Sequence, residues 1–316
     1  MNKKILIGSN GGLTGIYLAK QFSKMKKYTL LGVDSSKTTA GKLFVDNQYY
    51  ISNSNAPNFL DELIDLINKE KIDYYIPTHS LEIRKISEFA DKLKKRTNTR
   101  FLVSPIETFY ALENKEQAYY SLSNAQIPTP KLITNEKTTY PIIMKSKFGS
   151  GGSSVLKIDN QDIHHAFRKS NNDICFFEYV SGPEYTVDCC FDSTGTLLAH
   201  NVRKRIKTTG GAVVITQNAT EVNILPWLKK MAAQWTFCGC VNFQFIVQNE
   251  QPYFTDINLR YPSGGLPLTV HSGINVPEIM IRLLDGETIN QDEYIINPQV
   301  QTMYRYYEEV FSYDIN

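Results

Sequence analysis

The first hundred residues alternate short apolar runs with longer stretches in which apolar residues recur every three or four positions. The short runs predict buried strands, at 3–9, 28–34, 72–78 and 101–104. The periodic stretches predict helices, at 13–25, 58–71 and 80–96. Because strands that alternate with helices form parallel βαβ units, we expect an α/β domain with a doubly wound parallel sheet over residues 1–106.

Beyond Pro105 the pattern changes to short strands joined by tight turns. Helices are expected at 107–125, 224–236 and 276–286. The predicted strands follow one another closely, at 141–147, 153–158, 175–180, 185–192, 197–205, 240–247 and 252–260. We therefore expect a largely antiparallel α+β region in two parts, residues 107–180 and residues 181–316.

The chain is close to electrically neutral, with 34 basic and 32 acidic residues among 316. This balance does not favour a nucleic-acid or membrane-surface partner. No stretch approaches the roughly 18 apolar residues that span a bilayer, and the basic start leads into a strand rather than a signal peptide. We expect a cytoplasmic protein whose five cysteines are reduced and buried.

A glycine-rich turn, Gly8 to Gly15, follows the first predicted strand and opens the first predicted helix. Asp34 ends the second predicted strand. A turn with an acid in this place is typical of dinucleotide sites, although the spacing is not GxGxxG. Three interpretations stay open: a nicotinamide site, an anion or substrate contact, and a purely structural turn.

A second glycine-rich segment follows Lys145, which comes directly after an apolar run. The loop at 148–154, which contains Ser150 and Gly151, consists mainly of glycine and serine. A lysine beside such a loop can reach phosphate oxygens while the loop amides close over them. Taken alone, the loop could equally be a mobile linker.

Two glutamates flank the next predicted turn. Glu178 and Val180 lie where one predicted strand ends, and Glu184 precedes the next strand. The backbone from Glu178 to Val180 can hydrogen-bond an adenine edge, and Glu184 can accept hydrogen bonds from ribose hydroxyls. The alternative is a plain hairpin with exposed acids.

Polar residues alternate along the strand predicted at 252–260. Asp256, Asn258 and Arg260 share one face of it because residues two apart point to the same side. Gln244 can join them from the neighbouring strand. Oxygen ligands of this kind suit Mg²⁺, and Arg260 adds a planar donor group for an acyl phosphate. Because Asp and Asn are poor strand formers, their placement here indicates a site.

These features follow one another in an order that resembles the ATP-grasp superfamily. The branch that is similar contains carbamoyl-phosphate synthase large chains and biotin carboxylases, and the resemblance includes an opening segment at Glu113 to Lys115. It covers nearly the whole chain. It implies a Rossmann-like pre-ATP-grasp domain (1–106), a lid subdomain (107–180) and a C-terminal catalytic subdomain (181–316).

The resemblance also implies roles for single residues. The nucleotide would be bound by Lys115, Lys145, Ser150, Gly151, Glu178, Val180 and Glu184. The metal ligands would be Gln244, Asp256 and Asn258, and the catalytic residues would be Lys145, Arg205 and Arg260. Candidate substrate contacts are Glu82, Arg203, Arg205, Ser263 and Gly264. The family usually has glutamate where Asp256 stands, so the bridging of two metals is in doubt.

The activity implied by the resemblance is that of an ATP-dependent carboxylate–amine ligase. Such an enzyme activates a small carboxylate, such as an amino acid, as an acyl phosphate and couples it to an amine, with ATP and Mg²⁺ (or Mn²⁺) required. The partners expected are these small molecules and a second copy of the chain in a homodimer. Two alternatives stay open: a nucleotide-binding sensor or scaffold without ligase chemistry, and a nicotinamide-dependent enzyme that uses the first domain.

Overall fold

The structure is a computed structural model that describes residues 2–135, 138–149, 155–297, 299 and 301–312. Its strands are β1 (Lys3–Gly8), β2 (Tyr28–Asp34), β3 (Asn47–Tyr50), β4 (Tyr74–Ile76), β5 (Ile142–Ser146), β6 (Leu156–Ile158), β7 (Ile174–Glu178), β8 (Glu184–Phe191), β9 (Leu197–Thr209), β10 (Ala212–Asn218), β11 (Gly239–Gln248), β12 (Gln251–Asn258) and β13 (Thr302–Tyr304). Its helices are α1 (Leu13–Lys24), η1 (Ala40–Phe44), α2 (Phe59–Glu70), α3 (Ser80–Glu88), α4 (Ala90–Arg96), α5 (Ile106–Leu112), α6 (Lys115–Asn124), α7 (Gln161–Ser170), α8 (Leu225–Ala232), α9 (Leu266–His271), α10 (Val276–Asp285) and η2 (Gln291–Glu293), where η marks a 3₁₀ helix.

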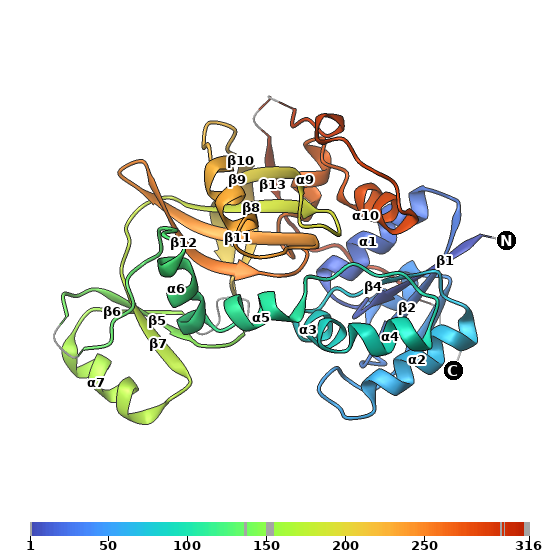
Figure 1. Ribbon diagram of the computed structural model, residues 1–316, viewed down its shortest axis with the longest axis horizontal. Coiled ribbons are helices and arrows are strands. Elements are labelled where there is room, and N and C mark those ends of the chain that lie inside the picture. Colours follow the sequence, from blue (N-terminus) through green and yellow to red (C-terminus); the bar gives the residue numbers. More distant parts are fainter. Residues whose placement is uncertain (1, 136–137, 150–154, 298, 300, 313–316) are drawn as a thin grey trace.

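A four-stranded parallel sheet of order β3-β2-β1-β4 forms the N-terminal part. Successive residues of β1 point to opposite faces. Ile5 and Ile7 pack on the side of α1 and α10, and Leu6 packs on the side of α2, α3 and α4. Helices thus cover both faces of the sheet (Figure 1), which confirms the predicted parallel α/β architecture.

Three details of this part differ from the prediction. The run at 101–104 is not a strand, and only Arg100 forms a bridge, to Tyr74 of β4. The helix expected at 80–96 is divided at Phe89, whose backbone is not helical. The short strand β3 was not predicted, because its sequence NQYY lacks the alternation of a half-buried strand.

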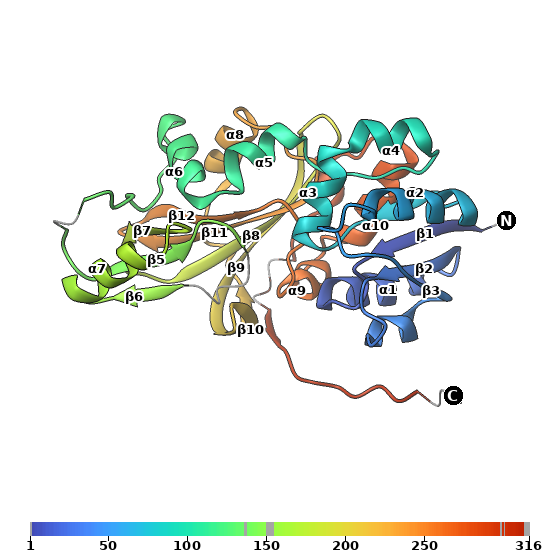
Figure 2. The ribbon, with the colours of Figure 1, turned by 90° about the horizontal axis from the view of Figure 1, so that it is seen from below.

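A six-stranded sheet of order β12-β11-β8-β9-β10-β13 forms the centre of the molecule, and its pairs are antiparallel. One face packs against α5, α6 and α8 (Figure 2). Val187 of β8 with Phe243 and Phe245 of β11 belong to this core, and each is completely buried. The antiparallel α+β prediction is therefore confirmed, although β10 and β13 were not predicted.

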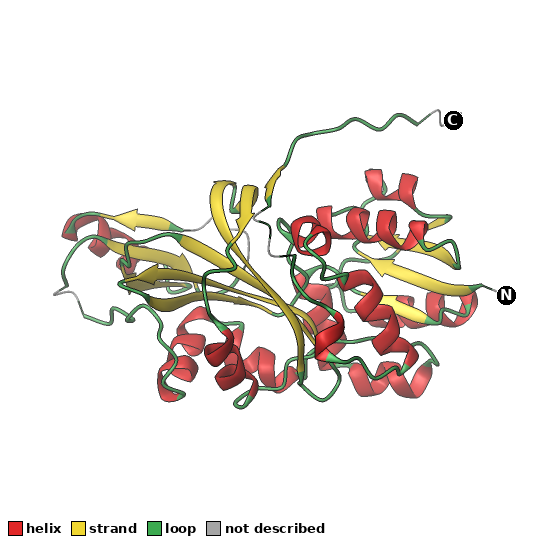
Figure 3. Cartoon of the chain, turned by 90° about the horizontal axis from the view of Figure 1, so that it is seen from above, coloured by secondary structure: helices red, strands yellow, loops and turns green. Residues whose placement is uncertain are grey.

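A smaller antiparallel sheet of order β6-β5-β7 lies at the end of the molecule remote from the parallel sheet (Figure 3). Ile142 and Met144 of β5 pack into its own core with Ile158 and Phe176. Helix α7, which was not predicted, packs against that core through the partly buried Phe167 and the buried His164, whose ring centroid lies 4.4 Å from that of Phe176. The boundaries of the three predicted domains stay a prediction.

The helix expected at 107–125 is interrupted at Glu113 and Asn114. The Asn114 side chain accepts hydrogen bonds from the backbone N–H groups of Glu116 and Gln117, both at 3.0 Å. It therefore caps a new helix, α6, by satisfying N–H groups that have no partner within the helix. Lys115 becomes the first residue of α6.

The expected burial of the cysteines is confirmed, because all five are buried, and none of them forms a disulfide. None of the helices in the described part of the chain is both long and apolar enough to cross a membrane. After β13 the chain runs away from the body of the protein, as Figures 2 and 3 show.

Candidate active site

A cavity of about 400 Å³ lies between the small sheet and the large sheet. The polar lining follows from the two-residue period of the strands. On β11, Asn242 and Gln244 face the cavity, whereas Phe243 and Phe245 face the core. On β5, Lys145 faces the cavity and Met144 faces the small core. The lining therefore combines polar strand residues with apolar ones such as Ile143, Phe177 and Ile246.

Most of the residues singled out from the sequence line this cavity. They are Lys115, Lys145, Glu178, Val180, Glu184, Arg203, Arg205, Gln244, Asp256, Asn258, Arg260, Ser263 and Gly264. Ser150 and Gly151 lie outside the described residues. Glu82 is not among them. The structure therefore brings together candidates that are up to 149 positions apart in sequence, from Lys115 to Gly264.

Two lysines enter the cavity from different elements. The Lys145 ammonium donates to the Thr255 carbonyl at 2.9 Å. Burial lowers the pKa of Lys145, and the nearby Asp256 carboxylate opposes this shift. The Lys115 ammonium donates to the Gly149 carbonyl at 2.8 Å. Each lysine has carbonyl oxygen as its hydrogen-bond partner, so both cations remain available to bind an anion.

The segment after β7 offers backbone groups to the cavity. Two hydrogen bonds to Lys131 hold Glu178 in place. The Glu178 carboxylate accepts from the Lys131 N–H at 3.0 Å, and the Glu178 N–H donates to the Lys131 carbonyl at 2.9 Å. Val180 is buried and lines the cavity. Among the described residues, none hydrogen-bonds to the backbone of Val180. This free edge can pair with a planar ring that carries both donors and acceptors.

Glu184 and Arg205 form an ion pair on neighbouring strands, with Oε1 and Nε 3.0 Å apart. Arg205 also donates to the Gly211 carbonyl at 3.1 Å. Burial lowers the pKa of Arg205, and the charge of Glu184 opposes this shift. The Glu184 side chain remains partly exposed to the cavity, which leaves it able to accept further hydrogen bonds.

The polar residues of β12 meet those of β11 across the cavity floor. Gln244 lies opposite Asp256 in the strand register. The Asn258 amide donates to the Asp256 carboxylate at 3.3 Å, and Arg260 donates to the Asn258 amide oxygen at 3.3 Å. The predicted proximity of Gln244, Asp256, Asn258 and Arg260 therefore holds in the structure.

The donor set at this position contains one carboxylate and two amides. No group of three or more His, Cys, Asp or Glu side chains that could hold a metal occurs in the described ranges. The set does fit Mg²⁺, which keeps several waters and binds through one or two carboxylates plus the phosphates of a substrate.

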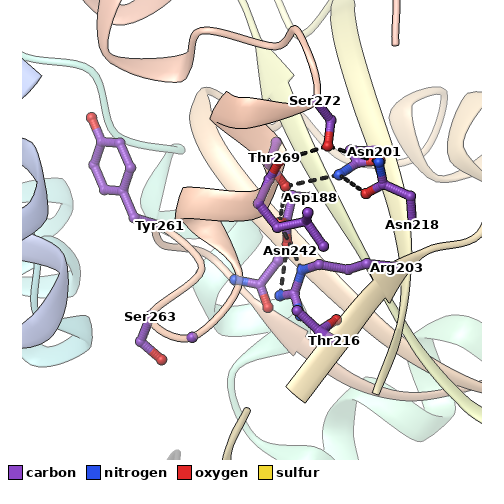
Figure 4. A network of polar contacts seen from close by, with 12 residues as sticks. Asp188, Asn201, Arg203, Thr216, Asn218, Asn242, Tyr261, Ser263, Thr269 and Ser272 are labelled. Atoms are coloured by element: carbon purple, nitrogen blue, oxygen red, sulfur yellow. Dashed lines mark hydrogen bonds and ion pairs between the residues drawn. The ribbon is translucent and has the colours of Figure 1, made fainter. Parts of the chain in front are cut away.

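Arg203 differs from its expected role as an open substrate contact. Its Nε and Nη2 atoms donate to the two carboxylate oxygens of Asp188 at 2.9 and 3.0 Å, and only 3% of the residue is exposed (Figure 4). The Thr269 hydroxyl donates to the same carboxylate at 2.6 Å. Two of the three donor atoms of Arg203 are thus committed to a buried network that also includes Asn201, Asn218 and Ser272.

Sequence reasoning missed Asp188 and Thr269 because neither lies in a motif. A usable signal existed in the strand YTVDCCF, where the buried Asp188 alternates with apolar residues. A charged residue that is almost completely buried requires a partner of opposite charge. Arg203 on the neighbouring strand supplies that charge.

A second cavity, of about 660 Å³, lies beside the N-terminal parallel sheet. Glu82 lines this cavity rather than the first one. Its buried carboxylate accepts from the Tyr75 hydroxyl at 2.5 Å and from the Thr78 N–H at 3.2 Å. Burial raises the pKa of Glu82. Glu82 therefore fixes the turn after β4, and it is not part of the cluster of candidates.

The glycine-rich turn also has internal partners. The Gly11 N–H donates to the Asp34 carboxylate at 3.0 Å, and the Gly12 N–H donates to the Ser9 carbonyl at 3.2 Å. A Cβ atom on Gly8 would lie 2.0 Å from the Glu82 carboxylate. Packing accounts for Gly8, and the Gly11 and Gly12 amides already have partners within the protein. The nicotinamide interpretation stays a prediction.

Comparison with known proteins agrees with this geometry. A model of the family described as "ATP-grasp in the biosynthetic pathway with Ter operon" matches residues 170–310. The crystal structure of a biotin carboxylase–β,γ-ATP complex from Campylobacter jejuni superposes with a TM-score of 0.75 at 19% identity, over 96% of this chain and 75% of that chain. This chain has the ATP-grasp fold.

Two further relatives show the range of ATP-grasp proteins that resemble this chain. An L-amino acid ligase structure from Bacillus licheniformis gives a TM-score of 0.74 at 15% identity, over 96% of this chain and 79% of that one. A carbamoyl phosphate synthase large chain from Clostridium botulinum (strain Loch Maree / Type A3) is 21% identical over 93% of this chain. The chain spans only 30% of the length of that curated relative.

Proposed function

We propose that the chain is an ATP-dependent carboxylate–amine ligase, which converts a small carboxylate into an acyl phosphate and transfers the acyl group to an amine. The observation that carries this proposal is the cavity between the two sheets. Lys115, Lys145, Arg203, Arg205 and Arg260 line it, and the acids among the lining residues are Glu178, Glu184 and Asp256. A polyphosphate needs such an excess of positive charge.

The nucleotide is proposed to lie along the cavity from the β7 segment to the β12 strand. The free backbone of Val180 would contact the adenine, with Glu178 beside it, and Glu184 would accept from ribose hydroxyls. Lys115 and Lys145 would contact the phosphates. In this arrangement residues 107–180 act as a lid over residues 181–316, and both domain boundaries are part of the proposal.

Asp256, with Gln244 and Asn258, would hold Mg²⁺ at the phosphate end. A bound Mg²⁺ would neutralise charge on the phosphates. The aspartate is one methylene shorter than the glutamate usual in the family, which favours a single ion held jointly with the substrate. The Arg260 guanidinium lies beside Asn258, where it is placed to bind an oxyanion.

The residues of the chain mainly position reactants and neutralise charge, as in other phosphoryl transfers. A carboxylate oxygen of the substrate attacks the γ-phosphorus, the bond to the β,γ-bridging oxygen breaks, and ADP leaves. Lys145 and Arg260 would stabilise the transferred group. An amine nitrogen then attacks the acyl carbon, the carbon–oxygen bond to phosphate breaks, and an amide, phosphate and one proton are released.

An amino acid is our proposal for the carboxylate. It rests on the basic lining of the cavity and on the structural similarity to a protein named L-amino acid ligase. A cytoplasmic location and a homodimer stay predictions from the sequence.

Phosphate release from Mg-ATP by the purified protein tests the proposal. The protein is screened against pools of amino acids and small carboxylic acids, and release should depend on one pool. Binding of ATP without release in any pool would favour the alternative of a nucleotide-binding sensor or scaffold. A protein that does not bind ATP would overturn the proposal.

A further inference from the structure

The cavity beside the parallel sheet meets the cavity between the two antiparallel sheets. Arg260 and Ser263 line both, whereas the other residues of each cavity are separate. Arg260 is also the residue that the proposed function places at the acyl phosphate. Arg260 therefore stands at the boundary of the two cavities, and a molecule in the N-terminal cavity would lie next to the residue proposed to bind the acyl phosphate.

The N-terminal cavity holds a carboxylate without a cationic partner. Asp34 lines it at the end of β2, and its two oxygens accept from the N–H groups of Gly11 and Ser36 at 3.0 and 2.9 Å. Among the described residues, no lysine or arginine forms an ion pair with Asp34. A fixed negative charge whose remaining lone pairs face a cavity is suited to an ammonium group.

Two leucines are exposed in the same cavity. Leu13 begins α1 and is 54% exposed, and Leu81 is near the start of α3 and is 41% exposed. Both line the cavity, together with the apolar side chains of Ile51 and Phe59. A single exposed leucine is ordinary, but two that face one hollow provide apolar surface for a ligand.

The first turn of α1 also opens toward this cavity. Its N-cap residue is Gly12, so no side chain caps the helix, and Leu13 and Thr14 line the cavity. The N–H groups of a first helical turn lack partners within the helix. A carboxylate on the ligand would be accommodated there, although this helix end alone would not define a site.

We propose that the N-terminal cavity binds the acceptor substrate, and that the acceptor is an apolar α-amino acid. Its ammonium group would contact Asp34, its side chain would pack against Leu13 and Leu81, and its carboxylate would face the start of α1. The inference rests on the proposed ligase function for its role but not for the binding itself. It gives the N-terminal domain the task of selecting the nucleophile.

Isothermal titration of the full chain with L-leucine tests the proposal. It is carried out alone and again with Mg²⁺ and a non-hydrolysable ATP analogue, with L-aspartate as the comparison ligand. L-leucine should bind with one site per chain, and L-aspartate should not bind. Failure of L-leucine to bind under both conditions would overturn the proposal.

Variants locate the binding. Asp34→Asn should weaken L-leucine binding at least about tenfold by removing the charge. The double variant Leu13→Ser/Leu81→Ser should weaken it about tenfold through lost apolar contact, and it changes only exposed side chains, so its folding is not in question. Asp65→Asn on the exposed face of α2 and Leu43→Ser, at an exposed leucine outside the cavity, are matched controls.

The outcomes separate the two proposals. Equal weakening by the controls, or unchanged binding in the double leucine variant, would contradict the acceptor site. Binding of L-leucine that requires Asp34, in a protein that does not bind ATP, would retain the site and refute the ligase function. ATP-dependent phosphate release without any L-leucine binding would retain the ligase function and refute the acceptor site.

Discussion

The two cavities of this protein differ in the sign of the charged side chains that line them. In the cavity between the antiparallel sheets, cations enter from four elements and the nearest partners of both lysines are carbonyl oxygens. The N-terminal cavity is lined by the acidic residues Asp34 and Glu82. Arg260, a cation, lines both cavities. The first suits a polyphosphate and the second suits an ammonium group.

The glycines of the turn after β1 line the N-terminal cavity rather than the cavity proposed for the nucleotide. The N-terminal turn is rich in glycine, yet its Gly11 and Gly12 amides are bound within the protein. The cavity that contains the cations depends on strand alternation instead. The two cavities are therefore distinguished by their cationic side chains and not by a glycine-rich turn.

The largest effect should come from removing a cation of the first cavity. Lys145→Ala should lower carboxylate-dependent phosphate release by at least about 100-fold, because the charge that stabilises the transferred group is lost. Lys157→Ala, at a half-exposed lysine of β6, is the control and should retain activity. Steady-state assays of both variants measure the effect, and equal activity of Lys145→Ala and wild type would remove Lys145 from the site.

The next effect concerns the buried pair beneath the same cavity. Asp188→Asn should lower the free energy of unfolding by about 3 kcal/mol, because it leaves Arg203 buried without a counter-charge. Urea unfolding measures this change. Arg203→Met added to Asp188→Asn should restore part of the loss. A loss under about 1 kcal/mol in the single variant would show that the pair is not structural.

A smaller effect should follow from a change of Asp256, the acid proposed to bind the metal. Asp256→Asn should weaken Mg-ATP binding about tenfold and leave binding of metal-free ATP nearly unchanged, because only the interaction with the cation is lost. Asp256→Glu keeps the charge and should bind Mg-ATP as the wild type does. Calorimetric titrations compare the three proteins, and equal loss with and without Mg²⁺ would place Asp256 elsewhere in the site.

The smallest effect belongs to the N-terminal cavity. Burial raises the pKa of Glu82 above its ordinary value of 4.5, so the folded state binds this proton more tightly than the unfolded state does. The stability that Glu82 contributes is therefore full below about pH 4.5 and is lost as the pH rises through the raised value. The free energy of unfolding of wild type relative to Glu82→Gln should fall from pH 4.5 to 7, and ATP affinity should not change. A constant difference across this range would contradict the structural role.

The sequence predicted correctly which residues lie together where they belong to a single strand. The alternation of Asp256 and Asn258 predicted a shared face with Gln244 beside it on the neighbouring strand, and the strand register places Gln244 opposite Asp256. The pairing of Asp188 with Arg203 could not be predicted, because it depends on the register between β8 and β9. Helix α7 was missed because most of its residues are polar and only His164 is buried. The role of Glu82 required knowledge of its burial, which no local pattern supplies.

Trapping of the acyl group with hydroxylamine tests whether the protein activates a carboxylate as an acyl phosphate. Wild-type protein is incubated with Mg-ATP, hydroxylamine and the pool of carboxylates that stimulates phosphate release, and the hydroxamate and the adenine nucleotide products are measured together. An acyl phosphate intermediate should give a hydroxamate formed in step with ADP. Formation of AMP instead of ADP, or release of phosphate without any hydroxamate, would contradict activation of a carboxylate as an acyl phosphate.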